Sequence, residues 1–387
     1  MQPLDPGIVD RVVDDDYCVA SAAAVRYVRA QAARILMELS FWSVVQAPLR
    51  AAEIAAALGV APVAHAACTW LVREIVRDGR ALRLSDGRYA AIADRAPGDE
   101  DLRSAGATLD QLASGIGSSR PMIDYAADQY VAFLTGRRSP QSILFKGAGL
   151  TLWESYFSAA NPLYDVHNQL AVAGLRHVWP TLPRPARILE IGTGTAGATA
   201  ALLDALGDWP GGRDTTLMMT DVAPSLLARA VARLDPHGCQ LTRMRLDFDR
   251  PLEDQGVETG SVDVIVGTNA LHSSHDVAAT LDSFRRVLSP AGHVVISEST
   301  CERGASVHQE FVFNLLPHSA AGPVDQVDPV DQVDPTDPMN PMSNEEVASR
   351  FLSTDRWRRV LSSHPFVSTV AVNTRRPELA VLAVASK

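Results

Sequence analysis

The stretch 187–197, R-I-L-E-I-G-T-G-T-A-G, constrains the fold more than any other part of the chain. Ile188, Leu189 and Ile191 form the short apolar run that is typical of a buried parallel strand. Glycines follow at once, and residues 198–206 are strong helix formers without a breaker. Strand, glycine turn and helix together predict the first βα unit of a nucleotide-binding α/β domain. The glycines would let the backbone turn sharply and approach a ligand closely.

Two acidic residues favour S-adenosylmethionine (SAM) over a dinucleotide as the ligand of this unit. Glu190 lies at the strand end, where a carboxylate repels a pyrophosphate but suits a cationic ligand or one with hydroxyl and amino donors. Residues 217–221, L-M-M-T-D, predict a second strand that ends in Asp221, where a ribose diol is usually held. We therefore expect SAM as cofactor; the alternatives are NAD and an α/β domain without a ligand.

Composition narrows the class of protein. The 387 residues suffice for two or three domains, and 47% hydrophobic with 21% charged residues is typical of a globular chain. The net charge of −10 disfavours a nucleic-acid partner. The cysteines are scattered without a C-x-x-C pair, which indicates reduced thiols and not disulfides or a zinc site. The first residues show neither a signal peptide nor a membrane span, so we expect a cytoplasmic protein.

The N-terminal third predicts a helical domain with a winged helix. Short helices over 50–59 and 62–78 precede two β-like runs around Asp86 and Gly87, a helix–turn–helix followed by a wing. Such an element can bind DNA, but the second helix offers only Arg73 and Arg77 as bases, so a dimerisation or capping role is favoured. The expected domains are 1–118 (helical, winged-helix-like), 119–184 (helical lid or linker) and 185–387 (cofactor binding), with a disordered insertion near 320–342 where P-V-D-Q-V-D repeats.

Seven strands are expected in the last domain, and helices separate the first five. The short connection N-T-R-R-P-E makes the last two an antiparallel hairpin. The predicted fold is α/β, with five parallel strands plus an antiparallel C-terminal hairpin, the sheet typical of class I methyltransferases. The predicted strands are 187–191, 216–220, 241–246, 262–267, 293–298, 367–372 and 379–385.

Ligands of such sheets bind at the carboxyl ends of the strands, so the polar residues at those ends are the candidate cofactor contacts. After the third strand, Asp247 would accept the adenine amino group and Phe248 would pack on the ring; the alternative is an acidic surface turn. The expected cofactor-binding residues are Glu190, Gly192, Gly194, Gly197, Asp221, Asp247, Phe248 and Asn269.

His272 and Glu298 are the candidate catalytic pair. They follow the fourth and fifth strands, which a right-handed crossover makes adjacent and parallel, about 4.8 Å apart. The two side chains should therefore emerge side by side, where the carboxylate would fix the imidazole tautomer and raise its basicity. The pair predicts a general base; the alternative is that each residue merely caps a strand end. His275 and Asp276 hint at a metal site, but nothing completes a ligand set, so no metal is expected.

Aromatic residues outside the predicted sheet are candidates for a substrate pocket. Trp153 and Tyr156 precede the first strand, and Phe313 and Leu316 belong to a helix predicted over 306–316. Their alternative role, core packing, is the commoner one for aromatic and apolar residues at helical spacing.

From about Tyr125 to its end the chain resembles the C-methyltransferase domains of polyketide synthases. The resemblance lies in S-I-L-F-K-G-A-G-L-T-L-W-E-S-Y-F-S, I-L-E-I-G-T-G-T-A-G-A-T, T-D-V-A-P, L-D-F-D-R-P, N-A-L-H, L-S-P-A-G-H-V-V-I-S-E-S-T and F-V-F-N-L-L-P. In that family the histidine of N-x-L-H and the glutamate that ends the fifth strand form a catalytic dyad, which matches His272 and Glu298. The resemblance implies removal of the α-proton of a β-ketoacyl thioester and methylation of that carbon.

Two departures from the family qualify this resemblance. Ala196 stands where a glycine is usual in the turn. The N-terminal module resembles that of small-molecule O-methyltransferases, where it pairs two subunits, and we expect it to be foreign to embedded synthase domains. A free-standing homodimer is therefore expected, and its acceptor is either a free small molecule or a carrier-bound acyl chain.

The sequence thus predicts a SAM-dependent C-methyltransferase of specialised metabolism, with no nucleic-acid or membrane partner. Three alternatives stay open. The chain could O-methylate a phenol or enol with the same His272. It could be a non-methylating SAM-fold cyclase or accessory protein. It could also be a winged-helix transcription factor with a SAM-sensing domain.

Overall fold

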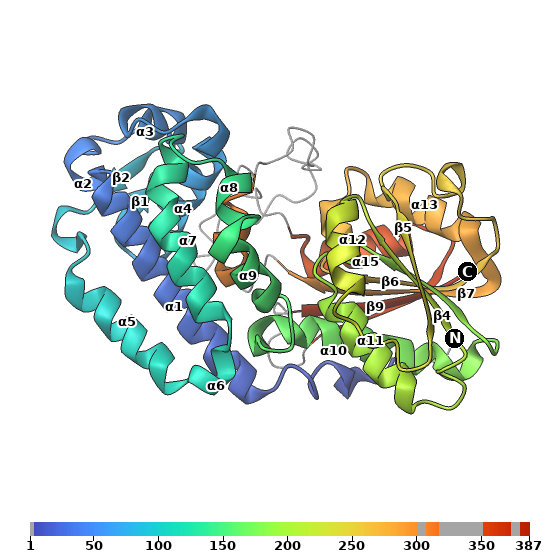
Figure 1. Cartoon of the computed structure of the whole chain (residues 1–387). Helices are drawn as coiled ribbons and strands as arrows, with labels where there is room; N and C mark the ends of the chain where they lie inside the picture. The colour runs from blue at the N-terminus through green and yellow to red at the C-terminus, as the bar shows by residue number, and fades with distance from the viewer. Residues whose placement is uncertain (1–3, 301–306, 317–350, 373–379) are drawn as a thin grey trace. The chain divides into compact units, whose positions relative to one another are not determined.

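The computed structural model describes residues 4–300, 307–316, 351–372 and 380–387 (Figure 1). The chain divides into two compact units. The sheet unit comprises Met1–Val13, Val166–Ser306 and Ser319–Lys387, and the helical unit comprises Asp14–Asp165 and Val307–His318. The insertion expected near 320–342 lies outside the described residues. The expected domain limits at 118 and 184 stay predictions.

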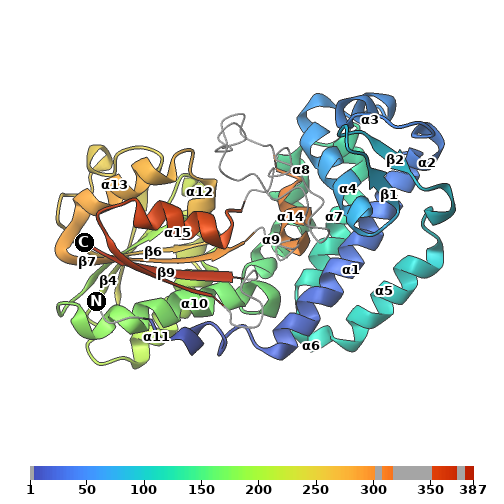
Figure 2. The same cartoon turned by 180° about the vertical axis from the view of Figure 1, so that it is seen from behind.

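The sheet unit contains a seven-stranded sheet with the order β5-β4-β3-β6-β7-β9-β8. Figure 2 shows this sheet from behind, with β6, β7 and β9 labelled. Strands β3 to β7 run parallel, and β9 is antiparallel to both of its neighbours, β7 and β8. The predicted α/β fold is therefore confirmed, including the C-terminal hairpin. The strands are β3 (Arg187–Ile191), β4 (Thr216–Asp221), β5 (Gln240–Arg245), β6 (Val262–Thr268), β7 (Leu288–Ser299), β8 (Val367–Val372) and β9 (Ala380–Ser386).

Helices cover the sheet on both faces. Those of the sheet unit are η1 (Pro6–Ile8), α10 (Pro162–Val178), whose first turn lies in the helical unit, η4 (Trp179–Thr181), α11 (Gly197–Asp208), α12 (Pro224–Val231), η5 (Glu253–Gln255), η6 (Leu271–Ser273), α13 (Val277–Val287) and α15 (Thr354–Ser362).

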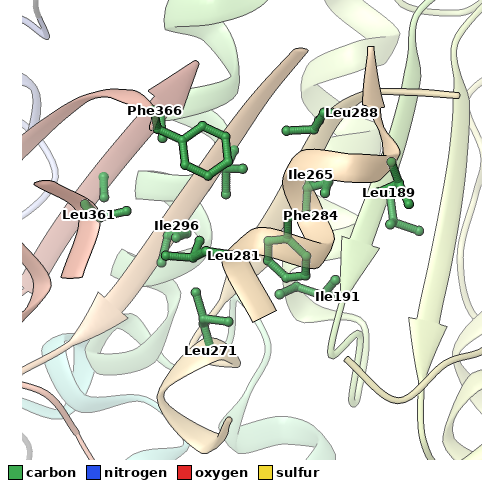
Figure 3. Packing of buried hydrophobic residues seen from close by; sticks show 14 of the residues in the cluster. Leu189, Ile191, Ile265, Leu271, Leu281, Phe284, Leu288, Ile296, Leu361 and Phe366 are labelled. Carbon is green, nitrogen blue, oxygen red and sulfur yellow. The ribbon is translucent and has the colours of Figure 1, made fainter. Parts of the chain in front are cut away.

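One face of the sheet carries the main core (Figure 3). Leu281 and Phe284 of α13 pack there with Leu189 of β3, Ile265 of β6 and Ile296 of β7. Strand β6, V-D-V-I-V-G-T, is buried along its whole length, as expected of a central parallel strand covered on both faces. This burial fixes β6 and β7, the two strands whose carboxyl ends carry His272 and Glu298.

Helix α10 lies on the face of the sheet opposite to the main core and α13. A Cβ at Gly174 would come within 2.5 Å of Val295 Cγ1 and 2.9 Å of Leu382 Cδ1, so this glycine lets the helix approach β7 and β9 closely. Side chains alternate along a strand, so Ser297 and Ser299 share this face with Val295. Glu298 points to the other face, where its β9 neighbour Val381 belongs to the main core.

The helical unit contains the elements predicted for a winged helix, in the expected order. Helices α3 and α4 precede the antiparallel pair of β1 and β2, and Gly87 takes φ +79° in the turn between them. A dimerisation role for this module stays a prediction. The elements of the unit are α1 (Asp15–Glu38), α2 (Phe41–Val44), α3 (Ala51–Ala57), η2 (Pro62–Ala64), α4 (His65–Arg77), β1 (Ala81–Arg83), β2 (Tyr89–Ala91), η3 (Ala93–Arg95), α5 (Asp99–Gln111), α6 (Ala113–Ile116), α7 (Ser119–Leu134), α8 (Pro140–Leu144), α9 (Gly147–Tyr156) and α14 (Val307–Phe313).

Helix α14 is held in the helical unit by specific contacts, although it follows β7 in sequence. Trp70 Nε1 donates to Glu310 Oε2 at 2.5 Å, and the Tyr130 hydroxyl donates to the Phe311 carbonyl at 2.5 Å. The rings of Tyr130 and Phe311 also stack, with centroids 4.7 Å apart. Among the described helices, none is long and apolar enough to cross a membrane.

Candidate functional site

The glycine turn after β3 uses left-handed backbone at three positions: Gly192 (φ +64°), Gly194 (φ +54°) and Ala196 (φ +66°). A Cβ on Gly192 would lie 2.7 Å from the Ala270 Cβ, so this glycine lets the turn pack against the residues that follow β6. A Cβ on Gly194 would meet nothing closer than 3.8 Å. The backbone at Gly194 is therefore open to a close-lying ligand. Gly197 begins α11.

Glu190 is buried beneath this turn, with 2% of its surface exposed. Its Oε2 accepts hydrogen bonds from Thr199 Oγ1 (2.6 Å) and Thr193 Oγ1 (2.9 Å). Burial raises the pKa of Glu190 to about 7; the two threonine hydroxyls oppose this shift, and the charge of Asp221 adds to it. These bonds tie Glu190 to the turn and to the start of α11, and sequence reasoning gave neither threonine a role.

Replacing Glu190 by Gln should change how stability depends on pH. A folded-state pKa near 7, above the ordinary 4.5, means that protonation stabilises the fold below pH 4.5 and that this contribution is lost as pH rises through 7. Gln stays neutral, so the unfolding free energy of Glu190→Gln minus that of wild type should increase by up to about 3 kcal/mol between pH 4.5 and pH 8.

Urea unfolding of the cofactor-free proteins at both pH values measures this difference. Groups that titrate alike in both proteins cancel in it. A difference that does not change with pH would show that the folded protein does not oppose ionisation of Glu190.

Asp221 ties the end of β4 to the glycine turn. Its Oδ2 accepts the Gly194 N–H at 2.8 Å, and its Oδ1 accepts the Ala223 N–H at 2.8 Å. Each carboxylate oxygen keeps a second lone pair that can accept a further hydrogen bond. Val222 beside it is 54% exposed, which places an apolar side chain next to these oxygens at the edge of the sheet.

Asp247 and Phe248 lie at the carboxyl end of β5, as expected, and both are half-buried. Asp247 Oδ1 accepts the Asp249 N–H at 3.1 Å, and Phe248 packs against the main core. Asp249, which sequence reasoning missed, accepts from Ser274 Oγ and from the His275 N–H, both at 2.9 Å. It thereby ties the loop after β5 to the loop after β6.

The described residues do not form the metal site that His275 and Asp276 suggested. His275 Nδ1 contacts Asp249 Oδ2 at 2.5 Å, while Asp276 caps α13 by accepting the Ala279 N–H at 3.0 Å. Within the described ranges, no group of three histidine, cysteine, aspartate or glutamate side chains could hold a metal ion.

His272 and Glu298 lie side by side, and this predicted proximity is confirmed. His272 Nδ1 is 2.7 Å from Glu298 Oε2. The fully buried Glu298 also accepts, through Oε1, the backbone N–H groups of Ala270 (3.0 Å) and Leu271 (2.7 Å). Three donors therefore converge on one carboxylate, as expected for a buried ionised group that must be fully hydrogen-bonded.

This arrangement selects one tautomer of His272. An ionised carboxylate only accepts, so Nδ1 carries the proton and Nε2 presents its lone pair. The His272 side chain is 9% exposed, and its ring lies 4.5 Å from that of Phe351, centroid to centroid. Phe351 comes from the segment after the insertion, and no sequence signal linked it to the histidine.

Asn269 forms the turn between β6 and the histidine, with φ +45°. Its Oδ1 accepts the Ser299 N–H at 2.7 Å, whereas its Nδ2 is buried and has no hydrogen-bond partner within the described residues. A buried donor without a partner is costly, so this amide fits a ligand that offers an acceptor. Asp221 can accept hydrogen bonds from hydroxyl groups, the Asn269 amide can donate to a carboxylate, and Gly194 leaves room for a ligand to lie close to the backbone. This edge of the sheet therefore fits a ligand that carries both hydroxyl and carboxylate groups, as SAM does.

Three of the four expected substrate residues, Trp153, Tyr156 and Phe313, lie in one aromatic cluster of the helical unit. Trp153 and Phe313 lie 5.9 Å apart, and Phe157 contacts both at 4.7 and 5.8 Å. Tyr156 is fully buried, and its hydroxyl donates to the His308 carbonyl at 3.4 Å. Leu316 is half-buried after α14. Their contacts are those of core packing, and a role in substrate binding stays a prediction.

The strand order and the glycine turn are those of the class I methyltransferase fold. Residues 189–294 match the family model of a methyltransferase domain. The chain is 34% identical over 265 residues to the polyketide synthase ThaG of Burkholderia thailandensis, covering 64% of this chain and 4% of ThaG. It spans less than a tenth of the length of the curated relatives that it matches.

Solved structures show the same fold over the whole chain. The CurJ carbon methyltransferase matches with a TM-score of 0.75 and 19% identity, covering 99% of both chains. The CMeT domain of the citrinin polyketide synthase matches with a TM-score of 0.72 and 16% identity, covering 99% of this chain and 97% of that one. Residues 189–294 thus form a methyltransferase domain, and the chain has the fold of polyketide synthase C-methyltransferase domains.

These matches correct one expectation. The N-terminal helical module is not foreign to synthase domains, because the match to the citrinin synthase domain covers 99% of this chain. The expectation was wrong because a helix–turn–helix and wing pattern in the sequence does not by itself separate a synthase domain from a free-standing enzyme.

Proposed function

We propose that this chain is a SAM-dependent C-methyltransferase that methylates the α-carbon of a β-ketoacyl thioester or of a similarly enolisable acyl substrate. The observation that carries the proposal is the bond between His272 Nδ1 and the buried Glu298 carboxylate, which leaves Nε2 to take a proton. The likeness to polyketide synthases supports the class of substrate.

The carboxyl edge of the sheet would hold the cofactor. Asp221 would accept the ribose hydroxyls, Asn269 Nδ2 would donate to an acceptor such as the methionine carboxylate, and the backbone at Gly194 leaves room for close approach. Val222 offers an apolar surface for the adenine, with Asp247 and Phe248 at the end of the neighbouring strand. When bound, SAM supplies an electrophilic methyl group.

The residues of the chain supply the base. His272 Nε2 takes the α-proton, and the carbon keeps the electron pair. That pair would form the new bond to the methyl group while the methyl–sulfur bond breaks and S-adenosylhomocysteine is released. Glu298 stabilises the imidazolium without accepting its proton, because it already holds Nδ1–H and two backbone N–H groups. The imidazolium then returns the proton to solvent.

The acceptor is proposed to be a small molecule or an acyl chain bound to a carrier protein, and the protein to be a homodimer. Methyl transfer from isotope-labelled SAM to free β-ketoacyl thioesters, carrier-bound β-ketoacyl chains and phenols tests the substrate. Mass spectrometry and NMR then locate the label. Label on the α-carbon supports the proposal, whereas label on oxygen of the thioesters or phenols would identify an O-methyltransferase.

A further inference from the structure

We propose that His167 is a positioning residue for the His272–Glu298 pair and that it acts through Ser299 and Asn269. The proposal rests on the function proposed above, because it assigns the network a role in that proton transfer. His167 lies on α10, on the face of the sheet opposite to Glu298, and sequence reasoning gave it no role. Its side chain is fully buried.

The first link joins His167 to the end of β7. His167 Nε2 lies 2.9 Å from Ser299 Oγ, and Ser299 itself is 1% exposed. Ser299 directly follows Glu298 in β7. A buried hydrogen bond at this place restrains the last residue of the strand from the α10 face, because leaving either polar group unpaired in the interior is costly.

The second link joins β7 to the turn that carries the histidine. The Ser299 N–H donates to Asn269 Oδ1 at 2.7 Å, and Asn269 takes the uncommon φ of +45°. The next two residues, Ala270 and Leu271, donate their N–H groups to Glu298 Oε1. The side-chain bond of Asn269 and these two backbone bonds together hold the turn 269–271 against the end of β7.

The two faces of the strand explain why His167 can act only indirectly. Glu298 points toward the main core, whereas Ser299 points toward α10, since neighbouring residues of a strand alternate. His167 therefore acts from the Ser299 side of β7. Through Ser299, it can restrain the position of the last residues of β7. This restraint would set the conformation of the Asn269 turn and the geometry of the contact between Glu298 and His272.

The test compares two serines of the same strand and face. Ser299→Ala removes the hydroxyl that contacts His167. Ser297→Ala removes an equally buried hydroxyl that has no hydrogen-bond partner within the described residues, and is the matched control. His167→Leu removes the ring nitrogen, and His167→Gln restores a polar group near the Nε2 position.

Two readouts separate positioning from stability. One is the pH midpoint of the His272 ring, followed by NMR in the cofactor-free protein and assigned with His272→Ala. The other is kcat with its pH profile. We expect Ser299→Ala and His167→Leu to shift the His272 midpoint and to lower kcat about 10-fold, which is about 1.4 kcal/mol in the barrier, with KM unchanged. His167→Gln should recover part of both.

Equal midpoints in wild type, Ser299→Ala and Ser297→Ala would overturn the proposal. If His167→Leu does not fold, Ser299→Ala carries the test alone. The NMR readout needs no methyl transfer, so it distinguishes failure of the network from failure of the proposed function. A shifted midpoint in a protein that methylates none of the substrates would retain the network and reject the function.

Discussion

His272→Ala should lower kcat for α-carbon methylation by about 10²–10⁴-fold, the range that a positioned general base contributes. SAM should bind to the variant nearly as to wild type, because the proposed cofactor contacts lie on β3, β4 and the Asn269 turn. Steady-state kinetics with labelled SAM, together with calorimetric titration of SAM, measure the two effects separately. Loss of SAM binding in parallel with kcat would instead make His272 a cofactor contact.

Glu298→Gln should be almost as severe, because it reverses the tautomer of the histidine. The one carbonyl oxygen of Gln would still accept the N–H groups of Ala270 and Leu271, so its NH₂ would face His272 Nδ1. Nδ1 must then accept, the ring proton moves to Nε2, and the base is lost.

The double variant His272→Ala with Glu298→Gln should be no slower than His272→Ala alone, because two groups that act as a unit are not additive. If the fold-loss in kcat of the double variant equals the product of the two single losses, Glu298 does not act through the histidine. Circular dichroism of all three variants checks that the fold is kept.

Gly192→Ala should have the largest effect on the fold of the site. The alanine would have to keep the left-handed backbone of Gly192, and its Cβ would lie 2.7 Å from the Ala270 Cβ. We expect backbone strain and overpacking together to lower the unfolding free energy by about 2–4 kcal/mol. Since the Ala270 N–H donates to Glu298, the clash should also disturb the contact between Glu298 and His272. Denaturant unfolding of the cofactor-free protein measures the loss.

Gly194→Ala is the matched control, because Gly194 has a similar positive φ but open space around it. It should cost only about 1–2 kcal/mol, from the backbone strain alone. Equal losses for the two variants would contradict the close packing of Gly192 against the Ala270 turn.

The sequence was sufficient to predict the sheet and the contact between His272 and Glu298, for a physical reason. Buried parallel strands read as continuous apolar runs, and residues that follow two adjacent parallel strands must emerge at one edge. The contact between His272 and Glu298 follows from those two facts. The positions of Gly192, Gly194 and Asp221 around the turn follow in the same way.

The site contacts that the sequence did not predict join segments that are far apart in the chain. Phe351 reaches the His272 ring from beyond the insertion, and His167 reaches Ser299 from a helix that precedes the first strand of the sheet. Glu190 was expected at the cofactor, and only the structure shows that two threonine hydroxyls occupy its Oε2. No local pattern encodes such pairings, because they are set by how the helices pack on the two faces of the sheet.

The most direct measurement is exchange of the α-proton of a β-ketoacyl thioester in D₂O, followed by NMR with S-adenosylhomocysteine in place of SAM. It isolates proton removal from methyl transfer. We predict that wild type exchanges the α-proton well above the rate in buffer, and that His272→Ala and Glu298→Gln do not. Exchange at the buffer rate in wild type, or exchange that survives in His272→Ala, would contradict the proposal that His272 is the base.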